Sequence, residues 1–196
     1  MMKLILASQS IRRSEILEQV GIDFTVIPSG FDEESIQLDH PIEYVKTLAY
    51  KKAESLSCLN EENSLVLGAD TVVVIDGHIL GKPHSVDQAK KYLRLLSGRE
   101  HQVYTGICLY RLQDQKTIID HQMTKVVFDT LTEDDIDFYT STKEPFDKAG
   151  GYGIQGIGAR FVKEIHGDYF NVVGLPVNLI IKLLKEMGDV YENRNK

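Results

Sequence analysis

The amino-acid sequence predicts an α/β fold built on a twisted mixed β-sheet with flanking helices, and an α+β arrangement is the alternative. Two observations support this class. Strand-like apolar runs and segments with helical apolar spacing are mixed along the whole chain. No repeat, linker or low-complexity segment divides its 196 residues. We therefore expect a single domain over residues 1–188, followed by a loose C-terminal tail over residues 189–196.

The N-terminal part of the chain alternates short strands with helices. Residues 3–7 are a predicted buried strand, and residues 24–27 are a second one. Between them, Ser10 is the expected N-cap of a helix that ends near Val20, before Gly21. Residues 41–58 predict a long helix with one apolar face, which contains Ile42, Val45, Leu48, Ala49, Ala53 and Leu56.

The middle of the chain begins with a strand over residues 65–75 that ends at a hairpin signal, Asp76-Gly77. Ser85 with Gln88 resembles a capping box, and it opens a helix that ends near Leu96. The chain therefore returns to helix directly after the hairpin.

The remaining elements follow the same mixed pattern. Two long β-rich runs cover residues 101–112 and 116–128, and Thr132 is expected to cap a short helix with acids in its first turn. A strand is expected near residues 160–165, and a final helix over residues 176–187.

Charge and composition exclude several classes of function. The net charge of −7 argues against a large nucleic-acid surface, although a few local cations can still bind a small anion. No apolar run approaches the length of a membrane span or of a signal-peptide core. The two cysteines, Cys58 and Cys108, have neither metal-binding nor redox spacing, which suits a reducing compartment. These features predict a cytoplasmic protein that binds neither nucleic acid nor membranes.

A glycine-rich segment, Glu144–Gly158, is the most unusual part of the sequence. It contains an Asp147-Lys148 pair and five glycines within fifteen residues. Glycine loses more backbone entropy on folding than any other residue, so such a run is typical of sharp turns or of backbone that approaches a ligand closely. The alternative is an ordinary glycine-rich turn between two strands.

A second candidate site lies at the start of the first helix. Ser8 precedes Arg12 and Arg13, which fall in the first helical turn. The helix dipole disfavours cations at this end, whereas free N–H groups there favour an anion such as phosphate. Two arginines in this position therefore indicate an anion site, unless they are solvated or pair with Glu15 or Glu18.

Acids and lysines in three other places could belong to a phosphate and metal site. Asp70 stands inside an apolar strand, where it is either a catalytic or metal-binding carboxylate or a partner of a backbone amide. Lys82 lies on a turn between glycine and proline and could reach a phosphate. The acids 32–34 and the lysines 51–52 are typical of solvated surface, but Mg²⁺ commonly binds one or two carboxylates together with substrate phosphates. The histidines show no ligand spacing.

Several motifs together resemble the Maf family, in order and in spacing. They are LASQSIRR, GADTVV, GKP, SGREHQVYTG, EPFDKAGGYGIQG and GDYFNVVGLP. The resemblance implies a nucleoside triphosphate pyrophosphatase that uses a divalent cation, Mg²⁺ or Mn²⁺, and removes non-standard or surplus nucleotides. It also implies an elongated fold with two lobes around a central cleft, as in inosine triphosphate pyrophosphatases.

The resemblance also implies roles for individual residues. Asp70 corresponds to the proton acceptor, and Glu33 to the metal-binding or catalytic acid; both carboxylates are expected metal ligands. Lys82 is expected to be catalytic. The phosphate-contacting set is Ser8, Arg12, Lys52 and Lys82, and the positions linked to substrate choice are Arg13, Thr71 and Gln155.

The combination of Thr71 with Gln155 resembles the subfamily that acts on dTTP and UTP rather than the one that prefers 7-methyl-GTP. Ile11 replaces the usual proline of the arginine motif, and Gly151 replaces a common alanine; neither change removes a functional group. The alternative function is a nucleotide-sensing regulator of septum formation without essential turnover. The sequence does not fix an oligomeric state, and a homodimer stays open.

Overall fold

The computed structural model describes residues 2–36, 38–61 and 63–188, so the predicted tail over residues 189–196 lies outside the described residues. The chain divides into two compact units. The first unit comprises Met1–Asp70, Thr105–Gln122 and Gly174–Lys196, and the second comprises Thr71–Tyr104 and Met123–Val173. The single domain expected over residues 1–188 stays a prediction.

A seven-stranded mixed sheet provides the framework, with strand order β2-β1-β3-β5-β6-β7 and β4 paired with β3. Its strands are β1 Lys3–Leu6, β2 Phe24–Val26, β3 Ser64–Ile75, β4 His78–Leu80, β5 Glu100–Arg111, β6 Thr117–Phe128 and β7 Val162–His166. β1 runs parallel to β2 and β3, whereas β4 is antiparallel to β3 and β7 is antiparallel to β6. The predicted mixed sheet is confirmed.

The helices are α1 Ile11–Gln19, α2 Pro41–Glu54, α3 Val86–Leu96, α4 Glu133–Thr140, α5 Tyr169–Val173 and α6 Val177–Met187. The expected helix over residues 41–58 ends four residues early, because the backbone tightens after Glu54: Leu56 and Ser57 donate to carbonyls only three residues back. The sequence did not predict α5, which has only five residues. None of the helices in the described ranges is both long enough and apolar enough to cross a membrane.

The predicted residues Ser10, Ser85 and Thr132 all occupy N-cap positions, but their side-chain hydrogen bonds differ. Thr132 forms a complete capping box with Asp135 at the start of α4. The Ser85 hydroxyl accepts from the Gln88 N–H, but the Gln88 side chain accepts from the His84 N–H instead, so the predicted capping box is only half formed. Ser10 occupies the N-cap position of α1 without a side-chain hydrogen bond to the helix.

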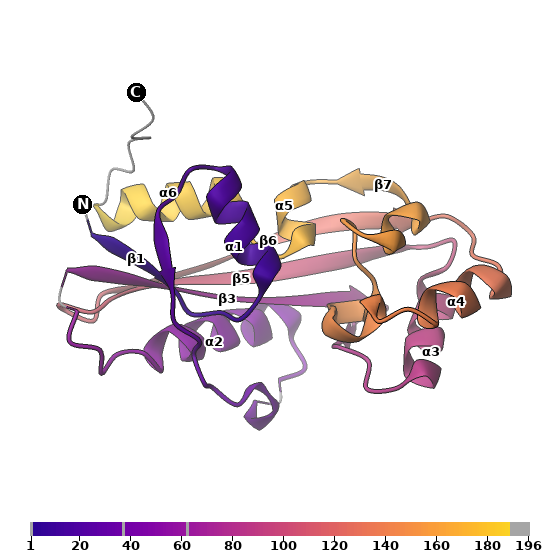
Figure 1. Cartoon of the computed structure of the whole chain (residues 1–196), viewed down its shortest axis with the longest axis horizontal. Helices are drawn as coiled ribbons and strands as arrows, with labels where there is room; N and C mark the ends of the chain where they lie inside the picture. The colour runs from indigo at the N-terminus through magenta and orange to yellow at the C-terminus, as the bar shows by residue number, and fades with distance from the viewer. Residues whose placement is uncertain (1, 37, 62, 189–196) are drawn as a thin grey trace. The chain divides into compact units, whose positions relative to one another are not determined.

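In the first unit, helices cover both faces of the strands: α1 and α6 lie on one side, and α2 lies on the other (Figure 1). Every residue of β3 from Ser64 to Asp70 is buried, as expected for a strand covered on both faces. An apolar cluster joins α2 to the strands, and its buried members are Ile5, Ala7, Ala49, Ala53, Leu56, Val66, Cys108 and Tyr110.

Two glycines let α2 approach the strands closely. A Cβ atom on Gly68 of β3 would collide with the carbonyl oxygen of Ala49, and one on Gly106 of β5 would collide with that of Val45. Backbone therefore packs directly on backbone at both places. This close packing brings the C-terminal half of α2 against β3 beside Asp70.

The second unit has its own core, in which aromatic rings pack edge to face. Phe128 and Tyr152 lie with ring centroids 4.7 Å apart, and Tyr139 and Phe161 lie 5.0 Å apart. His101 is buried with its Nε2 2.7 Å from the Tyr152 hydroxyl, and burial lowers its pKa to about 4. His101 is thus a structural histidine.

Candidate functional site

Asp70, Lys52 and Glu33 form a buried charge cluster in the first unit. The Lys52 Nζ lies 2.7 Å from Asp70 Oδ1 and 2.8 Å from Glu33 Oε1. Only 6% of the Lys52 side chain and 9% of the Asp70 side chain are exposed, whereas 42% of the Glu33 side chain is exposed. The cluster is therefore closed on the side of Asp70 and open to solvent on the side of Glu33.

Local structure explains how each member reaches the cluster. Lys52 stands four residues after Leu48 on the apolar face of α2, so its stem is buried against β3. Asp70 follows Gly68 and Ala69 on β3, directly beside α2. Glu33 opens a short 3₁₀ turn, Glu33–Ser35, whose N-cap Asp32 accepts a hydrogen bond from the Glu34 N–H.

Burial raises the pKa of Asp70 above its ordinary value, since a charged carboxylate is poorly solvated there. The positive charges of Lys52 and Arg13 oppose this shift, and the negative charge of Glu33 adds to it. A carboxylate whose pKa is raised by burial, and which a lysine holds in place, has the properties of a general base.

Arg13 forms a second buried centre at the start of α1. Its Nε donates to the Gly174 carbonyl at 2.9 Å, and its Nη1 donates to the Ser8 hydroxyl at 3.1 Å and to the Ala69 carbonyl at 2.9 Å. Burial lowers its pKa, and the nearby Asp70 and Glu33 carboxylates oppose that shift. The Ser8 hydroxyl also accepts from the Ser10 N–H, so one hydroxyl organises the turn between β1 and α1.

The Ala69 carbonyl links these two centres. It accepts from Arg13 Nη1 at 2.9 Å and from Lys52 Nζ at 3.4 Å. Arg12 is half-buried next to Arg13, and its charge further lowers the Arg13 pKa. The structure thus gathers six predicted residues around the middle of β3: Ser8, Arg12, Arg13, Glu33, Lys52 and Asp70. An environment with three cations and two carboxylates suits a phosphate ligand bound with a metal ion.

Sequence reasoning missed Tyr44. Burial raises its pKa, and so do the negative charges of Asp70 and Glu33. Tyr44 stands two helical turns before Lys52 on α2, so it shares the same helical face. That spacing is the signal from which it could have been found.

The other predicted residues belong to the second unit. Thr71 follows Asp70 on β3 and is half-buried, Lys82 is exposed before the buried Pro83, and Gln155 is exposed within the glycine-rich segment. In that segment, Lys148 Nζ donates to Asp147 Oδ1 at 2.6 Å and to the Glu144 carbonyl at 3.0 Å. The Asp147-Lys148 pair is therefore engaged within its own segment.

The carboxylate pair fits a divalent cation. In the described ranges no group of three or more His, Cys, Asp or Glu side chains is arranged to hold a metal. Asp70 and Glu33, however, both contact the same ammonium group, so their oxygens converge on one point. Two carboxylates completed by substrate phosphates are a common arrangement for Mg²⁺.

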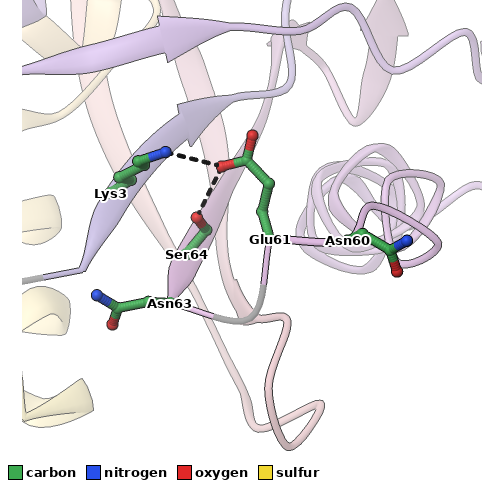
Figure 2. A pocket seen from close by; sticks show the side chains of 5 residues that line it. All are labelled: Lys3, Asn60, Glu61, Asn63 and Ser64. Carbon is green, nitrogen blue, oxygen red and sulfur yellow. Dashed lines mark hydrogen bonds and ion pairs between the residues drawn. The ribbon is translucent and has the colours of Figure 1, made fainter.

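A separate polar pocket in the first unit is lined by Lys3, Asn60, Glu61, Asn63 and Ser64. Figure 2 shows Glu61 between Lys3 and Ser64; its Oε2 lies 3.5 Å from Lys3 Nζ and accepts from the Ser64 hydroxyl at 3.2 Å. These polar groups satisfy one another, and the pocket is lined by none of the residues predicted from sequence.

Comparisons with known proteins agree with the motifs. A family model described as "Maf-like protein" matches residues 3–187. A dTTP/UTP pyrophosphatase of Clostridioides difficile is 50% identical over 94% of this chain and 95% of its own length. A protein of the same name from Syntrophus aciditrophicus is 48% identical over 96% of this chain and 91% of its own length. Another, from Bacillus cytotoxicus, is 48% identical over 95% of this chain and 96% of its own length.

One solved structure supports the fold. The Staphylococcus aureus Ham1 protein matches with a TM-score of 0.55 over 94% of this chain and 99% of its own, at 18% identity. That likeness concerns the fold alone, and together with the family match it confirms the predicted α/β class.

Proposed function

The chain belongs to the Maf family, and we propose from this premise that it is a nucleoside triphosphate pyrophosphatase that hydrolyses dTTP and UTP. The products are the nucleoside monophosphate and pyrophosphate. Curated relatives that are about half identical along nearly the whole chain carry this activity in their name. The activity makes the chain an enzyme of nucleotide-pool maintenance.

The assignment of catalytic roles rests on one structural observation. The buried Asp70 is held by Lys52, which also binds a second carboxylate, that of Glu33. A protein that only senses nucleotides needs cations for the phosphates, but it has no need of an aspartate whose pKa burial raises. The cluster therefore supports turnover rather than binding alone.

Asp70 acts as the general base in this proposal. Lys52 holds Oδ1 and so orients the carboxylate, which takes a proton from the attacking water. The water oxygen bonds to the α-phosphorus, the bond from that phosphorus to the bridging oxygen breaks, and pyrophosphate leaves. Arg12 and Lys52 offset negative charge on the phosphates as it shifts toward the leaving group.

A divalent cation, Mg²⁺ or Mn²⁺, would be held by Asp70 and Glu33 together with substrate phosphates. When bound, it would supply charge neutralisation and polarise a phosphoryl oxygen. Glu33 is the more exposed of the two carboxylates, so it presents an oxygen to a ligand that enters from solvent. Lys52 contacts both carboxylates, so its ammonium lies beside the point where the cation and the phosphates would meet.

The substrate-selecting roles rest on the resemblance and on side-chain chemistry. Gln155 is exposed, and its amide offers a donor and an acceptor to the edge of a base. Arg13 selects indirectly, because its guanidinium fixes Ser8 and the Ala69 and Gly174 carbonyls. Thr71 and Lys82 keep the roles that the family motif gives them, base selection and phosphate contact.

We also propose a cytoplasmic location, which the two free cysteines support: Cys58 is exposed and Cys108 is buried. The net charge of −7 supports the absence of a nucleic-acid partner. A homodimer stays a prediction that size measurement in solution would decide.

A panel of nucleotides tests the function. The purified chain is incubated with dTTP, UTP, CTP, GTP, ITP and 7-methyl-GTP, each with Mg²⁺ or Mn²⁺, and released pyrophosphate is measured. We expect the highest kcat/KM for dTTP and UTP. Binding of nucleotides without any pyrophosphate release would favour the sensing regulator, and a preference for ITP or 7-methyl-GTP would overturn the substrate assignment.

A further inference from the structure

The Glu144 carboxylate binds the backbone of the loop Gly153–Gly158 at several points within the second unit. Its Oε2 accepts from the Ile157 N–H at 2.8 Å, and its Oε1 accepts from the Gly158 N–H at 3.0 Å. The Tyr139 hydroxyl donates to the same Oε1 at 3.0 Å and accepts from the Gly153 N–H at 3.1 Å. Glu144 and Tyr139 together therefore bind both ends of this loop.

The glycines of the loop make room for these two side chains. A Cβ atom on Gly156 would collide with the Glu144 carboxylate, and one on Gly158 would lie 2.9 Å from the Tyr139 hydroxyl. A Cβ atom on Gly153 would collide with the Lys148 side chain, 2.5 Å from its Cε, and would lie 3.1 Å from Glu144 Oε1. Gly156 is thus explained by contact with Glu144 alone, whereas Gly153 also makes room for Lys148 and Gly158 for the Gly153 carbonyl, so all three are explained without any appeal to a ligand.

Gln155 lies between the bound ends of the loop. The N–H groups fixed by Tyr139 and Glu144 belong to Gly153, Ile157 and Gly158, which flank it on either side, while Gln155 itself is exposed. The direction of its side chain is therefore set by the loop backbone more than by packing of its own.

We propose that Glu144, supported by Tyr139, is the positioning residue that fixes the Gly153–Gly158 loop and thereby the base-reading amide of Gln155. The proposal rests on the function proposed above, since it assigns the loop to base recognition. Glu144 touches neither the phosphates nor the water in this account; it acts through Gln155.

The chemistry requires a carboxylate at this position. Two backbone N–H groups and one hydroxyl donate to it, and an ionised carboxylate accepts all three without offering a proton. Burial, and then the adjacent Glu144 charge, raise the pKa of Tyr139, so its hydroxyl stays protonated and remains a donor. A glutamine would place an NH₂ group against one of the donors and leave a backbone N–H without an acceptor.

The test compares substrate selection in Glu144→Gln and the parent enzyme. We expect the ratio of kcat/KM for dTTP to kcat/KM for GTP to fall about tenfold, mainly through a higher KM for dTTP. The reason is that a backbone N–H without an acceptor destabilises the loop conformation that positions Gln155. The amide protons of Gly153, Ile157 and Gly158 should exchange with solvent about tenfold faster. Reduced folding alone would lower turnover of all nucleotides equally and leave the ratio unchanged.

Two other variants calibrate this result. Glu164→Gln changes an exposed glutamate of β7 in the same unit, and it should leave both the ratio and the amide exchange unchanged. Gln155→Leu removes the base-reading amide itself, and it should change the ratio at least as much as Glu144→Gln does.

The outcomes separate the two proposals. Faster amide exchange with an unchanged dTTP to GTP ratio would overturn the positioning role and leave the enzyme assignment intact. If the parent enzyme released no pyrophosphate, the proposed pyrophosphatase function would be wrong. The ratio of the dissociation constants for dTTP and GTP, compared between Glu144→Gln and the parent, would then decide the role of the loop. If Glu144→Gln did not fold, Tyr139→Phe would take its place, since it removes one hydroxyl and keeps the ring contact with Phe161.

Discussion

Lys52 Nζ lies 2.7 Å from Asp70 Oδ1, and this buried ion pair connects α2 to β3 at the centre of the charge cluster. The same ammonium binds Glu33 at 2.8 Å, so one lysine holds two acids that would otherwise repel each other. This arrangement orients Asp70, and the charge of Lys52 opposes the rise of its pKa.

Replacing Asp70 with Asn keeps the shape of the side chain but removes the base. We expect kcat to fall by at least about 10²-fold, the usual contribution of a positioned general base. Pyrophosphate release from dTTP measures the loss, and thermal unfolding checks that the variant folds. Near-normal release by a folded Asp70→Asn enzyme would contradict the assignment of Asp70 as the base.

Replacing Lys52 with Met removes the largest influence that opposes the raised pKa of Asp70. The pKa of Asp70 should therefore rise further, and ionised Asp70 should be available only at higher pH. We expect the acid limb of the profile of kcat/KM against pH to move to higher pH, in addition to a lower maximum.

Lys51→Met is the matched control for this prediction. Lys51 is the neighbouring lysine, and its ammonium lies 2.8 Å from Glu54 rather than beside Asp70. Its removal should leave the acid limb in place. An acid limb that stays at the same pH in Lys52→Met would show that Asp70 ionisation does not govern this part of the profile.

Replacing Glu33 with Gln should weaken Mn²⁺ binding about tenfold or more, because one of two ionised oxygen ligands is lost. Electron paramagnetic resonance of free Mn²⁺ measures this affinity without turnover. Glu34→Gln is the control, since Glu34 is exposed on the same 3₁₀ turn. Equal Mn²⁺ affinities of the two variants would remove Glu33 from the proposed metal ligands.

The elements of the fold were largely predictable because their signals are local. Apolar spacing and turn residues predicted every strand except β4, together with five of the six helices in the described ranges. The hairpin signal Asp76-Gly77 placed the turn that β4 follows. The five-residue helix α5 escaped because it is too short to show a helical period; only Asp168, which accepts from two N–H groups of its first turn, marks it.

The candidate site was less accessible to such reasoning. The sequence motifs named Arg13, but its partner Gly174 is 161 residues away, and no local pattern joins them. The glycine-rich segment indicated close approach to a ligand, whereas the structure explains three of its glycines by contacts within the second unit, with Glu144, Tyr139, Lys148 and the Gly153 carbonyl. A glycine-rich composition predicts that another group approaches the backbone closely, but only the structure identifies that group.

Replacing Gly68 with Ala tests how the fold positions the charge cluster. The added methyl group would collide with the Ala49 carbonyl, a rigid backbone atom of α2 that cannot move without the helix. We expect the free energy of unfolding to fall by about 1–3 kcal/mol, the usual cost of overpacking a core. Since α2 also carries Lys52, kcat should fall as well.

Gly81→Ala is the control for the free energy of unfolding, because a Cβ atom there meets nothing within 4 Å and its backbone is not left-handed. Urea unfolding and pyrophosphate release measure the two effects. A stable Gly68→Ala enzyme with parental kcat would show that the close packing of α2 on β3 is dispensable for holding Lys52 against Asp70.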